Sequence, residues 1–141
     1  MGKPALLSLA PRPRLLLVDD DLAVGRFLAH AAEECGCEAH VTVSADSFRT
    51  EYRATRPDIV LLDLALPGSD GVELLRFLAE EQSQARILLI SGFDTRVLES
   101  AMRLGAAMGL AMAPPLHKPV RLDQLMAAMM GEEVADDPCL S

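Results

Sequence analysis

The chain has 141 residues, enough for one domain built around a single hydrophobic core. Half of the residues are hydrophobic but only 4% are aromatic, so aliphatic side chains and Met must form most of that core. The formal charge of −8 repels nucleic-acid phosphates and argues against direct nucleic-acid binding. No apolar run approaches the roughly 20 residues of a membrane span. The three Cys residues do not stand at the spacing of metal ligands, and their odd number suits a reducing compartment. We therefore expect a cytoplasmic protein without membrane contact.

Short apolar runs alternate along the chain with segments of helical periodicity. Residues 1–13 contain three Pro and are predicted to be a lead-in, and residues 131–141 are predicted to be an acidic tail. Between them, residues 14–130 are predicted to form one domain. The predicted strands are Leu15–Val18, Ala39–Val43, Ile59–Leu62, Ile87–Ile90 and Leu110–Ala113, the last of them followed at once by Pro114 and Pro115.

A segment with helical character follows each predicted strand. One of the three Asp residues at 19–21 can cap the first helix, and Ser44 can cap the second. Five strands alternating with five helices indicate an α/β fold: a five-stranded parallel sheet, doubly wound and flavodoxin-like, with helices on both faces. In such a sheet, ligands bind beyond the carboxyl ends of the strands.

The polar residues of interest all lie at those carboxyl ends. Asp19 and Asp20 follow the first strand, Asp63 the third, Ser91 the fourth and Lys118 the fifth. Three carboxylates brought together repel one another unless a cation or proton intervenes, and oxygen ligands of this kind suit Mg²⁺. A hydroxyl and an ammonium opposite them suit an anion with several oxygens. A phosphoryl group on the central carboxylate, Asp63, satisfies all of these groups.

Four motifs carry a resemblance to a known family. They are Leu16-Leu17-Val18-Asp19-Asp20-Asp21, Ile59-Val60-Leu61-Leu62-Asp63 with Pro67-Gly68 and Asp70-Gly71 after it, Ile90-Ser91-Gly92, and Lys118-Pro119. In this order, each at a strand end, they resemble the receiver domain of bacterial two-component response regulators. The resemblance covers about residues 14 to 130, nearly the whole predicted fold.

The resemblance implies a role for each matching acidic residue. Asp63 would be the phosphoacceptor and a ligand of Mg²⁺. Asp20 would bind the metal directly, and Asp19 would act largely through bound water. The backbone carbonyl of Ala65 would be a further ligand.

The resemblance also implies how the signal enters and leaves. Ser91 would be the switch hydroxyl, Lys118 would pair with the phosphoryl group, and the Lys118–Pro119 peptide bond would be cis. The donor would be a sensor histidine kinase or a phosphotransfer protein. The chain would be a phosphoacceptor signalling domain, not an enzyme, although it would assist its own phosphorylation and dephosphorylation. The output would pass to an unknown downstream protein, and homodimerisation stays open.

Two features depart from the usual receiver pattern. Pro115 stands where many receivers carry an aromatic switch residue, and the sequence has no aromatic residue after Phe93. The stretch from Ser91 to Lys118 is longer than usual by about one helical turn. The run Ser91–Ala101, then Leu104-Gly105 and Lys118-Pro119, resembles receivers fused to cyclic-di-GMP phosphodiesterase domains, and whether the chain acts alone or belongs to a longer one stays open. We expect His117 to be a flanking residue without a ligand role.

Three other interpretations compete with a working receiver. A haloacid-dehalogenase-like hydrolase would carry its nucleophile in a DxDx(T/V) pattern on the first strand, but Leu22 follows the Asp run here. A nucleotide or flavin binder lacks support because no glycine-rich loop follows the first strand. A degenerate receiver, acting as a phosphorylation-independent binding module, remains the alternative because the aromatic residue is missing.

Overall fold

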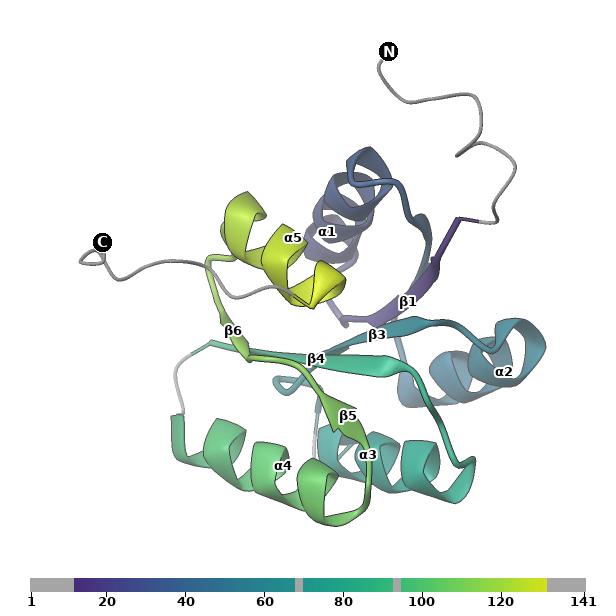
Figure 1. Ribbon diagram of the computed structural model, residues 1–141, viewed down its shortest axis with the longest axis vertical. Coiled ribbons are helices and arrows are strands. Elements are labelled where there is room, and N and C mark those ends of the chain that lie inside the picture. Colours follow the sequence, from purple (N-terminus) through teal and green to yellow (C-terminus); the bar gives the residue numbers. More distant parts are fainter. Residues whose placement is uncertain (1–11, 68–69, 93–94, 132–141) are drawn as a thin grey trace.

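The computed structural model describes residues 12–67, 70–92 and 95–131. The predicted acidic tail from residue 132 onward, most of the predicted lead-in, and Phe93 lie outside these residues. A parallel sheet with the order β2-β1-β3-β4-β5 runs through the molecule (Figure 1). Its four full strands are β1 (Arg14–Val18), β2 (Glu38–Thr42), β3 (Ile59–Asp63) and β4 (Arg86–Ser91). Each lies within one residue of its predicted bounds.

The fifth strand differs from the prediction because it is broken in two. β5 (Ala111–Met112) pairs with the start of β4, and β6 (Leu116–His117) pairs with the end of β4. Pro114 and Pro115 lie between the two pieces, and proline has no N–H to give to a neighbouring strand. The predicted strand Leu110–Ala113 agrees with β5 to within one residue at each end, but the second piece, β6, was not predicted.

Within the described residues five helices cover the sheet, as predicted for a doubly wound α/β fold. Figure 1 shows α1 (Leu22–Glu34) and α5 (Leu122–Met130) on one face. The helices α2 (Ala45–Thr55), α3 (Asp70–Glu80) and α4 (Thr95–Ala107) cover the other face. None of the helices in the described part of the chain is long and apolar enough to cross a membrane.

Alternate side chains of the central strands pack into two separate hydrophobic clusters, one on each face of the sheet. Leu16 belongs to the cluster under α2, α3 and α4, together with Phe48 of α2. Leu17 belongs to the cluster under α1 and α5, together with Leu28 of α1 and Leu125 of α5. Because β1, β3 and β4 are buried on both faces, their sequences are continuous apolar runs. A polar residue at the end of such a run is thereby held at the edge of a rigid core.

Helix termini are fixed by specific polar contacts. The Asp21 side chain accepts hydrogen bonds from the backbone N–H groups of Ala23 and Val24, which caps α1. Ser44 and Ser47 form a reciprocal capping box at the start of α2. At the other end of the fold, Arg86 Nε donates to the carbonyl of Ala128 in the last turn of α5, at 2.5 Å.

Candidate functional site

The carboxyl ends of β1 and β3 place two buried acids side by side. Asp63 is the last residue of β3 and Asp19 directly follows β1, its neighbour in the sheet. Each is only 1% exposed. The backbone N–H of Asp19 donates to the carbonyl of Thr42 at the end of β2, at 3.1 Å, which holds the start of the β1–α1 loop.

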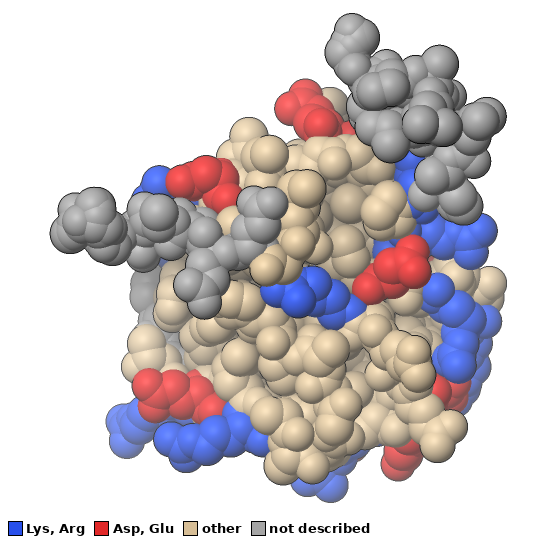
Figure 2. All heavy atoms as spheres, viewed as in Figure 1, with Lys and Arg blue, Asp and Glu red and all other residues tan. Residues whose placement is uncertain are grey.

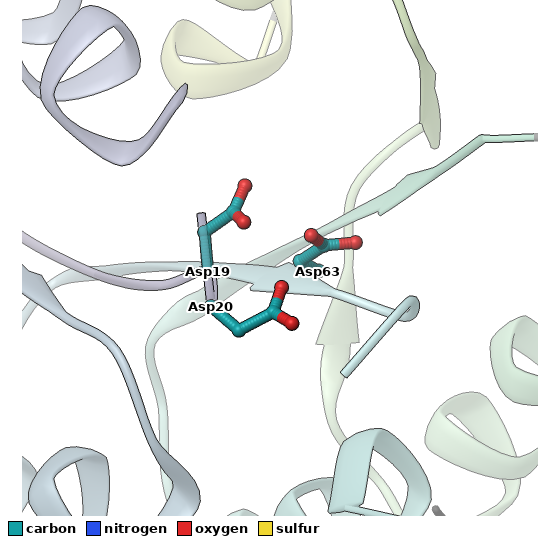
Figure 3. A group of neighbouring side chains, drawn as sticks. All are labelled: Asp19, Asp20 and Asp63. Carbon is teal, nitrogen blue, oxygen red and sulfur yellow. The ribbon is translucent and has the colours of Figure 1, made fainter. Parts of the chain in front are cut away.

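Asp20 completes a cluster of three carboxylates. One oxygen from each of Asp19, Asp20 and Asp63 lies within 4.8 Å of the other two. Figure 3 shows the three side chains reaching from the ends of their strands into a common space. Asp20 is exposed, so this space opens to solvent on one side. The structure thus brings these three side chains together, and their roles stay a prediction.

Lys118 reaches the same cluster from the end of the broken fifth strand. Its Nζ donates to Asp63 Oδ2 at 2.9 Å and lies 3.8 Å from Asp19 Oδ2. Burial by itself lowers the pKa of Lys118, but the hydrogen bond and the charge of Asp63 outweigh it. The pKa therefore lies above the ordinary value of a lysine, and the ammonium stays charged at neutral pH.

The two carboxylate oxygens of Asp19 differ in their hydrogen bonds. Oδ1 accepts the backbone N–H of Asp21 at 2.9 Å, whereas Oδ2 is buried without a hydrogen-bond partner among the described residues. Burial raises the pKa of Asp19 to about 6; the hydrogen bond from Asp21 opposes this rise and the charge of Asp63 adds to it. An orphaned oxygen beside two further carboxylates fits a divalent cation that prefers oxygen ligands, such as Mg²⁺.

Ala65 and Ser91 border the cluster. The backbone N–H of Ala65 donates to Asp63 Oδ1 at 2.9 Å, so both oxygens of Asp63 accept a hydrogen bond. Ser91 is 5% exposed and ends β4, the strand beside β3. Its carbonyl accepts the backbone N–H of Lys118 at 2.9 Å. The Lys118–Pro119 peptide bond is cis, as the resemblance implies.

Thr42 is a site residue that the sequence did not reveal. It is buried at the end of β2, and its Oγ1 donates to the carbonyl of Leu17 at 2.8 Å while its own carbonyl accepts from Asp19. It therefore positions the backbone that carries Asp19. A Thr within a predicted strand is too common to attract notice, because β-branched residues suit strands anyway.

Comparison with known proteins assigns the class. The family described as response regulator receiver domain matches residues 15–130. The response regulator MtrA of Mycobacterium tuberculosis, described as DNA-binding, is 33% identical over 67% of this chain and 42% of its own length. The photosynthetic apparatus regulatory protein RegA of Rhodobacter capsulatus is 30% identical over 89% of this chain and 78% of its own length. The chain belongs to the response-regulator receiver family.

A solved structure agrees with this assignment. A response regulator from Colwellia psychrerythraea is 33% identical and has a TM-score of 0.72, covering 86% of this chain and 96% of that one. Receiver domains are signalling domains that work with histidine kinases or phosphotransfer proteins, and they generally bind Mg²⁺ at an acidic pocket. The chain spans 42% of the length of MtrA, so what MtrA does as a whole is not transferred to this chain.

Proposed function

We propose that the chain receives a phosphoryl group on Asp63 from a phosphohistidine of a sensor histidine kinase or phosphotransfer protein. In this transfer a bond forms between a carboxylate oxygen of Asp63 and phosphorus. The bond between phosphorus and the donor's imidazole nitrogen breaks, and the imidazole leaves with the electron pair. The observation that carries the proposal is the buried Asp63 carboxylate, held at 2.9 Å by Lys118 and flanked by two further carboxylates.

The residues around Asp63 have distinct proposed tasks. Asp20 and Asp63 would hold Mg²⁺ directly, with Asp19 acting through water and Ala65 offering its backbone carbonyl. The bound ion supplies positive charge that offsets the carboxylates and the incoming phosphoryl oxygens. Lys118 would pair with one phosphoryl oxygen, and the Ser91 hydroxyl would donate to another.

The output would pass through protein contact on the side of the molecule that carries α4, β5, β6 and α5. Figure 2 shows much of this side covered by uncharged residues, with one blue group and a neighbouring red group near its centre and the other charged residues toward its borders. Val97 of α4 and Met126 and Met130 of α5 are exposed large apolar residues of these elements. Such an uncharged area suits a downstream protein or a second copy of the chain better than a nucleic acid.

The test is phosphorylation by acetyl phosphate, a small donor that replaces the unknown kinase. The intact mass of the wild type should rise by one phosphoryl group when Mg²⁺ is present and should stay unchanged when Mg²⁺ is chelated. Asp63→Asn should gain nothing, whereas Asp70→Asn, at the start of α3, should react as the wild type does. If the wild type binds Mg²⁺ but gains no mass, the phosphorylation-independent binding module becomes the better explanation.

A further inference from the structure

Four buried polar side chains are divided evenly among the four full strands of the sheet. Five polar residues are buried in the described part of the chain: Asp19, Thr42, Asp63, Ser83 and Ser91. All except Ser83 lie at or directly after the carboxyl end of a strand, one to each of β1 to β4. The proposed function gives a task to three of these four residues. Thr42, at the end of β2, has none.

Thr42 holds the end of β1 through two hydrogen bonds. Its Oγ1 donates to the carbonyl of Leu17 at 2.8 Å, and its own carbonyl accepts the backbone N–H of Asp19 at 3.1 Å. These two bonds fix the peptide groups on either side of Val18, one through its carbonyl and the other through its N–H. The backbone that leads into Asp19 therefore cannot turn without breaking one of them.

Asp19 lies just beyond the regular pairing of β1. The pairings of β1 with β2 and with β3 both end at Val18, which is opposite Thr42 on one side and Leu62 on the other. The hydrogen bond between Asp19 and Thr42 therefore carries the order of the sheet one residue further along the chain. Asp20 follows directly, so its position depends on the same stretch of backbone.

The direction of this backbone matters for a bound metal ion. Asp19 and Asp20 are neighbours in the chain, and their carboxylates reach the same space as that of Asp63 (Figure 3). Mg²⁺ requires nearly ideal octahedral geometry with oxygens at about 2.0 to 2.1 Å, so it tolerates little displacement of its ligands. A turn of the Asp19 peptide group displaces the carboxylates that follow β1 relative to the carboxylate of Asp63 on β3. The affinity for Mg²⁺ then falls.

We infer that Thr42 is a positioning residue for the metal site and that its hydroxyl sets the affinity for Mg²⁺. The hydroxyl acts through the carbonyl of Leu17 and the backbone that follows it. When the hydroxyl is removed, the end of β1 gains freedom, and Asp19 and Asp20 no longer keep the orientation that binds the ion. This inference rests on the proposed function, which assigns Mg²⁺ to these carboxylates.

The test is a calorimetric titration of the metal-free protein with Mg²⁺. Thr42→Val keeps the branched shape but loses the hydroxyl, and its dissociation constant should rise about ten-fold, the lower end of the loss expected when a group that orients a metal ligand is removed. Thr55→Val is the matched control and should bind Mg²⁺ as the wild type does. Thr55 Oγ1 donates to the carbonyl of Glu51 at 2.8 Å within α2, and the Thr55 carbonyl accepts from Arg14 at the opposite end of β1.

Unfolding by urea separates positioning from a purely structural role. Both Val variants lose a hydrogen bond from a hydroxyl to a backbone carbonyl, so both should be less stable than the wild type. A purely structural role for Thr42 predicts wild-type affinity for Mg²⁺ in both, whereas positioning predicts a loss in Thr42→Val alone. The Mg²⁺ concentration that gives half the maximal rate of phosphorylation by acetyl phosphate should rise by the same factor in Thr42→Val. The maximal rate should fall little, because Asp63 and Lys118 are unchanged.

A second pair of variants tests the hydroxyl even if Thr42→Val fails to fold. Thr42→Ser and Thr42→Ala both lack the methyl group, and they differ from each other only in the hydroxyl. Thr42→Ser should bind Mg²⁺ nearly as the wild type does, and Thr42→Ala should bind it about ten-fold more weakly. Equal dissociation constants in these two variants would overturn the inference and leave the proposed function in place. If the wild type itself binds no Mg²⁺, the metal site of the proposed function is overturned and the inference falls with it.

Discussion

Lys118 Nζ lies 2.9 Å from Asp63 Oδ2 and 3.8 Å from Asp19 Oδ2, so one ammonium serves two buried carboxylates that come from different strands. The acids are 1% exposed and the Lys118 side chain 29%. The ammonium offsets part of the repulsion between Asp19 and Asp63.

Lys118→Met should therefore destabilise the metal-free protein. The loss of a hydrogen bond between charged groups leaves Asp63 Oδ2 buried without its partner, and we expect a decrease of about 1.5 to 3 kcal/mol in the free energy of unfolding by urea. Mg²⁺ should recover part of this loss, because a divalent cation again offsets the carboxylates. Arg121→Met is the control: it breaks an exposed pair with Asp123, for which we expect a change of about 0.2 to 1 kcal/mol. Equal losses in the two variants would contradict a special role for Lys118.

Stabilisation by Mg²⁺ should depend on pH in a direction set by Asp19. Burial raises the pKa of Asp19 to about 6 in the folded, metal-free chain. A carboxyl group whose pKa is higher in the folded than in the unfolded state adds to the free energy of unfolding. This contribution is complete at low pH, where the group is protonated in both states. That contribution is lost as the pH rises through about 6. Over the same pH range Asp19 loses its proton and becomes the negatively charged carboxylate that attracts a cation.

We therefore expect millimolar Mg²⁺ to raise the melting temperature more at about pH 7.5 than at about pH 5. Differential scanning fluorimetry with and without Mg²⁺ measures both shifts. Asp19→Asn removes the titrating group and should reduce the difference between the two pH values. Equal shifts at both pH values in the wild type would contradict the raised pKa of Asp19.

Adjacent residues Asp20 and Asp21 should show opposite defects. Asp21→Ala removes the cap of α1 and should lower the free energy of unfolding by about 0.5 to 2 kcal/mol, with little change in Mg²⁺ affinity. Asp20→Ala removes an exposed carboxylate of the cluster and should weaken Mg²⁺ binding with little loss of stability in the absence of metal. Urea unfolding and Mg²⁺ titration by calorimetry test both variants. If Asp21→Ala weakened Mg²⁺ binding and Asp20→Ala did not, the assignment of Asp20 to the metal site and of Asp21 to the helix cap would be wrong.

The packing of α4 over β5 depends on Gly105. Any side chain at Gly105 would meet the flexible end of Met112 of β5, which must then move, so Gly105→Val should cost about 1 kcal/mol of stability through overpacking. Ala106→Val makes a β-branched substitution at the next, exposed helical position and should cost roughly 0.5 kcal/mol. Thermal unfolding compares them, and adding Met112→Ala should restore part of the loss in Gly105→Val. No rescue by that second substitution would rule out this contact as the cause.

The sheet and the acidic cluster were predictable because both depend on patterns along the chain. Apolar runs such as Leu15–Val18 mark strands buried on both faces, and parallel strands bring residues at their carboxyl ends together whatever their separation in sequence. The broken fifth strand was harder to place. The sequence showed that Pro114 and Pro115 interrupt it, but pairing resumes at Leu116 because β4 is long enough to hold a second piece.

Contacts that join side chains to distant backbone groups were not predictable. Arg86 holds the last turn of α5 through the carbonyl of Ala128, and Thr42 holds the carbonyl of Leu17. No spacing rule links such residues, because a backbone carbonyl has no sequence signature. Which of the three Asp residues at 19–21 caps α1 also became clear only from the hydrogen bonds of Asp21, since each of them could have capped the helix on its sequence position alone.

The most direct test of the central claim locates the phosphoryl group by chemistry. Borohydride reduces an aspartyl phosphate to homoserine, which marks the acceptor permanently in a peptide map. After treatment with acetyl phosphate and Mg²⁺, phosphorylation at the proposed acceptor predicts this conversion at Asp63 and at neither Asp19 nor Asp20. Conversion at one of those residues, or at no residue in protein that binds Mg²⁺, would contradict the assignment of Asp63 as the phosphoacceptor.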